Sequence, residues 1–157
     1  MVKPVPEGFH TLTPILTVRG AAAAIDFYRR AFGAEEVFRS PGPDGRIMHA
    51  QLRIGNSVFM LHDEFPEMGG KGPAALGGTP VGLWIYTDEV DAAWKRAVDA
   101  GATVKMPLSN QFWGDRFGMV EDPFGHQWSL AQHIEDVPRE EMPKRAQAAM
   151  AQQKKQP

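Results

Sequence analysis

The pattern of apolar and polar positions in the first half of the chain predicts a strand, a helix and then three strands. Residues 11–18 alternate between an apolar and a polar face, as expected of a half-buried strand. Residues 21–32 instead repeat apolar side chains at helical spacing, and Gly33 follows where a left-handed residue commonly ends a helix. Turn-forming dipeptides then separate three further strand candidates, at residues 35–39, 46–54 and 57–62.

The second half repeats this order. A strand is expected at residues 81–87, and a helix follows to Ala100, with Thr87 or Asp88 as its cap. Gly101-Ala102 ends this helix as Gly33-Ala34 ends the first one. Three more strands are expected, at residues 103–106, 116–121 and 127–132. An internal repeat of this kind is a stronger indication of fold than any single element.

The segments outside the two halves have different compositions. Residues 66–80 are rich in glycine and proline and have no apolar period, which predicts a mobile connector. Residues 138–157 are polar, and we expect a short helix there that frays by Ala148.

We therefore expect an α+β fold of two βαβββ modules that form a curved sheet or half-barrel around a central cavity. The domain should span residues 9–137, with the first module at about 9–65, the connector at 66–80 and the second module at about 81–133. The remaining residues, 138–157, form the tail.

Composition narrows the choice of partners. The formal net charge is −2 and 23% of residues are charged, so nothing indicates nucleic acid as a partner. No apolar run is long enough to span a membrane, and residues 1–10 lack the apolar core of a secretory signal. Cysteine is absent, which excludes thiolate ligands and a cysteine nucleophile and is consistent with a cytoplasmic location.

Several motifs resemble the vicinal-oxygen-chelate (glyoxalase/bleomycin-resistance/dioxygenase) superfamily. They include Phe32-Gly33-Ala34 and the run from Val120 to His126. The closer likeness is to the PhnB-like subgroup, through Thr13-Pro14, Trp113-Gly114-Asp115-Arg116 and the run from Asp122 to Trp128. This resemblance implies a homodimer, with or without modules swapped across the connector. It does not fix an activity, because the superfamily includes isomerases, dioxygenases, thiol transferases and drug-binding proteins.

Metal-dependent members of this superfamily carry one ligand on the first and one on the last strand of each module. Alignment of the helix starts and final turns places these positions at Thr13, Met60, Gly82 and Ser129. None of the four is a good ligand for a catalytic divalent ion. We therefore expect neither a metal nor any other cofactor.

Alternation turns a mainly apolar and aromatic set of side chains toward the cavity. Such a set suits a small organic ligand, although the same side chains also suit the filling of a small barrel. His62 is a candidate acid, base or hydrogen-bond donor, or simply a histidine at the barrel mouth. Trp113 and Arg116 either close over a ligand, or Trp113 plugs the end of the barrel while Arg116 forms a local ion pair with Asp115. The expected ligand-binding residues are Thr13, Met60, His62, Trp84, Tyr86, Trp113, Arg116 and Ser129.

The leading interpretation is a protein that binds a hydrophobic or aromatic small molecule, as the drug-sequestering members of the superfamily do. One alternative is a lyase or isomerase with a metal-independent or remodelled site, in which His62 is the low-ranking catalytic candidate. The other is a non-catalytic scaffold or regulatory dimer.

Overall fold

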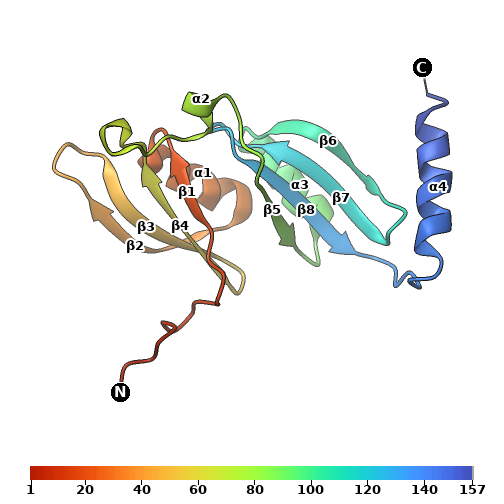
Figure 1. The fold of residues 1–157 in the computed structure, drawn as a ribbon, viewed down its shortest axis with the longest axis horizontal. Helices are drawn as coiled ribbons and strands as arrows, with labels where there is room; N and C mark the ends of the chain where they lie inside the picture. Colours follow the sequence, from red (N-terminus) through yellow and green to blue (C-terminus); the bar gives the residue numbers. More distant parts are fainter. Residues whose placement is uncertain (157) are drawn as a thin grey trace.

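The computed structural model describes residues 1–156, which form two βαβββ modules in tandem followed by a separate helix (Figure 1). The first module consists of β1 (Ile15–Val18), α1 (Ala21–Phe32), β2 (Glu35–Pro41), β3 (Ile47–Ile54) and β4 (Ser57–Asp63). The second consists of β5 (Gly82–Tyr86), α3 (Val90–Asp99), β6 (Thr103–Asn110), β7 (Asp115–Glu121) and β8 (Gln127–His133). The connector carries η1 (Pro66–Met68) and α2 (Pro73–Leu76), and the tail carries α4 (Met142–Gln153).

Each module has its own four-stranded sheet, and the two sheets have the same topology. The strand orders are β1-β4-β3-β2 and β5-β8-β7-β6. The first and last strands of each module pair in parallel, and the other pairs are antiparallel. The internal repeat and the α+β class predicted from the sequence are therefore confirmed. The two sheets remain separate in the described chain and do not close into one barrel.

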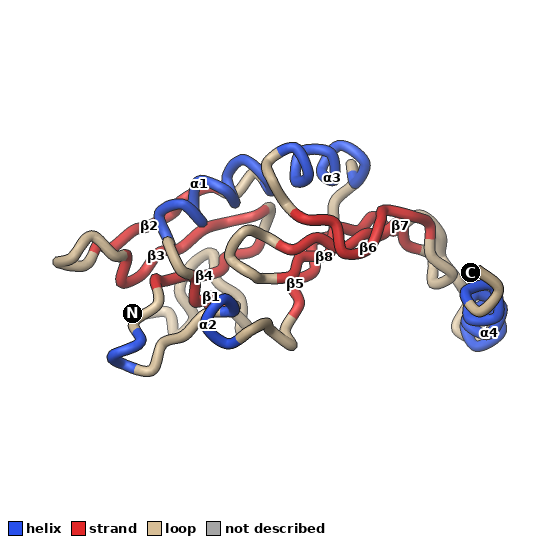
Figure 2. Tube along the Cα trace, turned by 90° about the horizontal axis from the view of Figure 1, so that it is seen from above, coloured by secondary structure: helices blue, strands red, loops and turns tan. Residues whose placement is uncertain are grey.

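Helices α1 and α3 lie side by side and cover the same side of the two sheets (Figure 2). The opposite side of each sheet is covered by neither of these helices, and we call it the open face. On β1 the alternation places Leu16 and Val18 in the core, whereas Ile15 on the open face is 57% exposed. Any ligand site built on the sheets therefore has two neighbouring open faces available.

Equivalent polar residues at the ends of β4 and β8 anchor the two helices. The Asp63 carboxylate accepts hydrogen bonds from the backbone N–H groups of Gly20 and Ala21 at the start of α1, both at 2.9 Å. Gln132 Oε1 accepts a 3.3 Å hydrogen bond from the N–H of Val90 at the start of α3. These acceptors satisfy donors that a helix N-terminus otherwise leaves unpaired.

The buried carboxylate of Asp122 joins the two modules. It accepts hydrogen bonds from the Tyr28 hydroxyl of α1 at 2.6 Å and from Trp128 Nε1 at 2.9 Å. It also accepts from the backbone N–H groups of Phe124 and His126. Burial and the neighbouring Asp122 carboxylate raise the pKa of Tyr28 well above its ordinary value, so the phenol remains a donor.

The structure corrects two element boundaries expected from the sequence and adds detail to the connector. Strand β1 begins at Ile15 instead of residue 11, because Pro14 has no N–H to donate and Leu12 projects into solvent. The connector contains two short helical turns and an antiparallel bridge between Phe65 and Gly70. Helix α4 continues past Ala148 to Gln153, because this alanine- and glutamine-rich segment has no breaker after its first turn.

No helix in residues 1–156 is long and apolar enough to cross a membrane.

Candidate functional site

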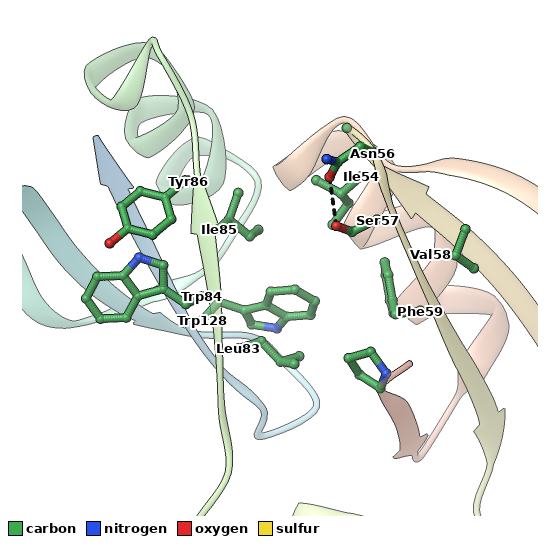
Figure 3. Close-up of a pocket in the computed structure, with 12 residues that line it drawn as sticks. Ile54, Asn56, Ser57, Val58, Phe59, Leu83, Trp84, Ile85, Tyr86 and Trp128 are labelled. Atoms are coloured by element: carbon green, nitrogen blue, oxygen red, sulfur yellow. Dashed lines mark hydrogen bonds between the residues drawn. The ribbon is translucent and has the colours of Figure 1, made fainter. Parts of the chain in front are cut away.

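Aromatic side chains dominate the open face of the second module. Trp84 and Tyr86 project from β5 onto this face with 45% and 62% of their surfaces exposed. Leu83 and Ile85, which alternate with them, point the other way, toward the first module (Figure 3). The two-residue period of the strand thus separates an aromatic face from an aliphatic one.

Two further aromatic residues extend this surface. The Trp84 and Phe117 rings stack with 4.8 Å between centroids and 11° between planes. Trp113 lies 5.7 Å from Phe117, and Tyr86 lies 5.8 Å from Trp84. We call Trp84, Tyr86, Trp113 and Phe117 the aromatic row. Because the buried Phe117 supports the Trp84 indole from one side, Trp84 offers a rigid, exposed aromatic surface for a planar ligand.

A buried carboxylate at the start of β7 holds the aromatic row in place. Asp115 Oδ2 accepts hydrogen bonds from the Tyr86 hydroxyl at 2.9 Å and from Trp113 Nε1 at 3.0 Å. Its Oδ1 accepts from His133 Nδ1 at 2.9 Å, and His133 Nε2 donates to Asp136 at 2.8 Å. Two members of the row are therefore fixed by one acceptor, which reduces the entropy that a ligand must remove on binding.

The charges in this cluster are mutually dependent. Burial acts to raise the pKa of Asp115, but hydrogen bonds from His133, Tyr86 and Trp113 outweigh it and lower the pKa. Hydrogen bonds to Asp136 and then Asp115 raise the pKa of His133 above 6.5. Both ring nitrogens of His133 face carboxylate oxygens, which is the arrangement expected of the protonated imidazolium.

We expect the pKa of His133 to lie above 6.5 and to fall in each of the variants Asp136→Asn and Asp115→Asn, because each removes a carboxylate that faces the ring. Since the folded-state pKa is raised, the stabilising contribution is complete below the unfolded value and is lost as pH rises through the folded value. Proton NMR titration of the ring measures this directly. A His133 pKa at or below 6.5 in the wild type would contradict the prediction.

Gly114, next to this cluster, permits close approach of the segment that leads to α4. Its φ is +100°, and its carbonyl accepts hydrogen bonds from the N–H groups of Ile134 and Glu135. A Cβ at this position would lie 2.1 Å from the Glu135 carbonyl oxygen. The glycine of the Trp113-Gly114-Asp115-Arg116 motif is therefore required by packing as well as by backbone conformation.

We expect Gly114→Ala to lower the free energy of unfolding by roughly 2–4 kcal/mol, because it combines backbone strain with a clash. Gly69→Ala is the matched control, since Gly69 also has a positive φ, +81°, but has open space at its Cβ. That control should cost only about 1 kcal/mol. If chemical denaturation showed the same loss of unfolding free energy in both variants, the contact with Glu135 would be unimportant.

A crevice of about 350 Å³ lies between the two modules and borders the aromatic row. One wall is the β3–β4 hairpin, and the other is β5 (Figure 3). Its lining side chains are uncharged and mostly apolar, and its volume lies within the range of small-molecule sites. The lining residues are Pro14, Ile54, Gly55, Asn56, Ser57, Val58, Phe59, Leu83, Trp84, Ile85, Tyr86 and Trp128.

The structure brings together only some of the residues predicted from the sequence. Trp84, Tyr86 and Trp113 belong to the aromatic row. Ser129 is opposite Trp84 in the sheet register and is buried. The remaining predicted open-face residues, Met60 and His62, belong to the first module, on β4.

Thr13 precedes β1, and its hydroxyl donates to the His10 carbonyl at 3.4 Å. Thr13 therefore lies outside the sheet, in the irregular segment that precedes β1.

Arg116 lies on the other side of its sheet, so the expectation that it closes over a ligand was wrong. Because Phe117 occupies the open face of β7, Arg116 points toward the helix side. Its guanidinium binds Asp91 of α3 at 2.7 Å and also donates to Asn110. The alternative of an Asp115–Arg116 ion pair was also wrong, since Asp115 pairs with His133.

The residues at the superfamily's metal-ligand positions do not fit a divalent ion. Thr13 and Ser129 offer only neutral hydroxyls, Met60 offers a soft thioether, and Gly82 has no side chain. Within residues 1–156, no group of three or more His, Cys, Asp or Glu side chains is placed to hold a metal. The donor set therefore provides no basis for metal-dependent chemistry at these positions.

Sequence reasoning missed Asp115, Phe117 and His133 as parts of the site. The pairing of the strands would have identified them, because Phe117 and Tyr86 are both opposite Ala131, and Asp115 is opposite His133. Had β7 been assigned from Asp115, its alternation would have placed Asp115 and Phe117 on the open face.

Comparison with known proteins identifies the family. A family model described as Glyoxalase/Bleomycin resistance protein/Dioxygenase superfamily matches residues 9–130. The chain belongs to this superfamily. It is 52% identical over 145 residues to an uncharacterized protein of Mycobacterium tuberculosis, covering 90% of this chain and 83% of that protein.

Solved structures of the superfamily agree with this assignment. The crystal structure of an Arabidopsis thaliana gene product is similar, with a TM-score of 0.63, 30% identity and coverage of 78% of this chain and 98% of that one. A PhnB protein from Bacillus cereus has the same fold, with a TM-score of 0.62, 22% identity and coverage of 78% and 99%. The predicted resemblance to the superfamily is thus confirmed, and the PhnB protein shares the fold. The superfamily name spans enzymes and resistance proteins, so membership alone does not select an activity.

Proposed function

We propose that this chain binds a hydrophobic or aromatic small molecule against the aromatic row, in the manner of a sequestering or resistance protein. The observation that carries the proposal is the exposed Trp84 indole stacked on buried Phe117. Contiguous exposed apolar surface, such as that of the neighbouring Trp84 and Tyr86 rings, commonly marks a binding site. The adjoining crevice offers apolar walls for the rest of a ligand.

The energetics favour a ligand with a flat apolar body. Burial of apolar surface contributes about 25 cal/mol per Å² before the costs of association. Stacking on an aromatic ring adds roughly 0.5–1.5 kcal/mol. Because Asp115 already holds Tyr86 and Trp113, little side-chain entropy is lost when the ligand arrives.

We propose that binding requires no metal or other cofactor. The side chains at Thr13, Met60 and Ser129 support this, because two neutral hydroxyls and a thioether are poor ligands for a divalent ion.

We also propose that the working form is a homodimer. Each module leaves one face of a four-stranded sheet uncovered by its helix, and apolar side chains such as Ile15 are exposed there. A second copy that covers these faces would enclose the ligand and remove this apolar surface from water.

Titration of the wild-type protein with 2-methoxynaphthalene, an uncharged planar probe, tests the proposal through tryptophan fluorescence. We expect saturable quenching with a stoichiometry of one probe per aromatic row. Linear, non-saturating quenching that persists when Trp84 is replaced would contradict the proposal.

A metal-independent lyase or isomerase is the second candidate, and the observation that favours it is the orientation of His62. One ring nitrogen of His62 is fixed by a backbone carbonyl, and the other lies on the open face beside Thr17. A histidine held in this way is able to accept a proton from a bound substrate.

A further inference from the structure

The positive charges of the second module are kept away from the aromatic row. The lysine and arginine residues within residues 82–133 are Lys95, Arg96, Lys105 and Arg116. Lys95 and Arg96 lie on α3, which covers the side of the sheet opposite the open face (Figure 2). Lys105 lies 3.7 Å from the Glu121 carboxylate, and Arg116 binds a carboxylate of α3 on the helix side. None of these side chains is therefore free to repel a positively charged ligand on the row.

Negative charge, in contrast, gathers at one end of the row. Burial acts to raise the pKa of Asp115, but its hydrogen bonds lower the pKa overall, so this carboxylate is ionised at neutral pH. The carboxylate of Asp136 faces the other side of His133, at 2.8 Å, and its side chain is fully exposed. Two carboxylates against one imidazolium leave a net charge of −1, which becomes −2 when His133 is neutral.

The Asp115 carboxylate also acts on the aromatic rings themselves. The Tyr86 hydroxyl and Trp113 Nε1 both donate to its Oδ2, at 2.9 and 3.0 Å. The face of an aromatic ring is negative, and donation of a ring proton to an anion polarises the ring and makes its face more negative. The hydrogen bond to Asp115, followed by burial, raises the pKa of Tyr86, so the phenol keeps its proton. Two rings of the row are therefore made more attractive to a cation.

The exposed rings are close enough together for one charge to contact both. The Trp84 and Tyr86 centroids are 5.8 Å apart, and the two side chains are 45% and 62% exposed. A cation is attracted to an aromatic face within about 6 Å of its centroid, most strongly to tryptophan. A planar cation on Trp84 is therefore also near Tyr86, whose hydroxyl is bound to the Asp115 carboxylate.

We propose that the preferred ligand of the aromatic row is a planar aromatic cation, with its positive charge on the ring system as in a quaternised nitrogen heterocycle. This inference rests on the proposed function, which requires only an apolar or aromatic ligand. The carboxylates of Asp115 and Asp136 and the absence of a free lysine or arginine on this face of residues 82–133 add the requirement for positive charge.

Two probes of the same size, 1-methylquinolinium and uncharged 4-methylquinoline, test this by isothermal titration calorimetry. We expect the wild type at pH 7.5 to bind the cation about 5- to 20-fold more tightly. Asp136→Asn should reduce this preference by about half, because it removes one charge near the row. Asp26→Asn makes the same change of charge on the exposed side of α1 and should leave the preference unchanged.

The pH dependence provides a second measurement that needs no variant. The groups that face His133 are Asp115 on β7 and Asp136 in the segment after β8, and both stay ionised above pH 7. As pH rises through the raised pKa of His133, the ring loses its charge and the cluster becomes more negative. The preference for the cation should therefore increase by about twofold between pH 7 and pH 9. His133→Gln should show the higher preference already at pH 7, with no further increase.

The outcomes separate the inference from the proposed function. Equal binding of both probes, or tighter binding of 4-methylquinoline, overturns the inference and leaves the proposed function standing. An equal loss of preference in Asp26→Asn and Asp136→Asn also overturns it, because the preference would then reflect the charge of the whole protein. Failure of the wild type to bind either probe overturns the proposed function and the inference together.

Discussion

Replacement of Asp122 by asparagine is expected to lower the free energy of unfolding by about 2–4 kcal/mol. The substitution keeps the shape of the side chain but replaces one carboxylate oxygen by an NH₂ group. That group then faces donors, because Oδ2 accepts from both the Tyr28 hydroxyl and Trp128 Nε1 in a fully buried setting. Unpaired buried donors cost about 1–3 kcal/mol each. Chemical denaturation followed by tryptophan fluorescence measures the change.

Two other variants separate this effect from a general loss of charge. Asp26→Asn changes an exposed carboxylate on α1 and should alter stability by less than about 0.5 kcal/mol. Tyr28→Phe removes one partner of Asp122 and should cost about 1 kcal/mol. If Asp122→Asn proved no more destabilising than Asp26→Asn, the account of how the modules are joined would be wrong.

Replacement of Trp84 by alanine is expected to weaken binding of 2-methoxynaphthalene by roughly 10- to 100-fold, because it removes the indole that Phe117 supports and on which the ligand stacks. The indole stacks on Phe117 and belongs to no hydrogen-bond network that holds the modules together. The variant should therefore fold normally, which circular dichroism and a melting curve check. Isothermal titration calorimetry measures the affinity without relying on the tryptophan signal.

Matched substitutions define what Trp84 contributes. Trp84→Phe keeps an aromatic ring and should lose less than about tenfold in affinity. Arg116→Ala lies on the opposite side of the sheet, where Arg116 binds Asp91, and should leave the affinity unchanged within about twofold. A larger effect from Arg116→Ala than from Trp84→Ala would place the ligand elsewhere.

Local patterns were sufficient to predict most of the fold. The helix at Ala21–Phe32 matches its apolar spacing and its terminal glycine, and the repeated order of elements predicted the paired modules. Alternation also assigned Trp84 and Tyr86 to the open face. These features depend on neighbours along the chain, and the sequence shows such neighbours directly.

The site itself depends on contacts between residues far apart in sequence. The Asp115 cluster joins residues of β5, β7 and the end of β8, so its existence follows from strand pairing that no local pattern reveals. Arg116 was misplaced for the same reason, since its face follows from its pairing with Gln132, the residue that accepts a hydrogen bond from the start of α3. The orientation of the His62 ring likewise depends on the position of the Asp63 carbonyl beside it.

Native mass spectrometry combined with elemental analysis tests whether the aromatic row binds an aromatic ligand without a metal. The protein is purified without chelator or affinity tag and is then exposed to 2-methoxynaphthalene. We expect a dimer without stoichiometric divalent metal that carries one probe molecule per aromatic row, and no such adduct in Trp84→Ala. A stoichiometric divalent metal in the purified protein, or adducts equally abundant in Trp84→Ala, would contradict this expectation.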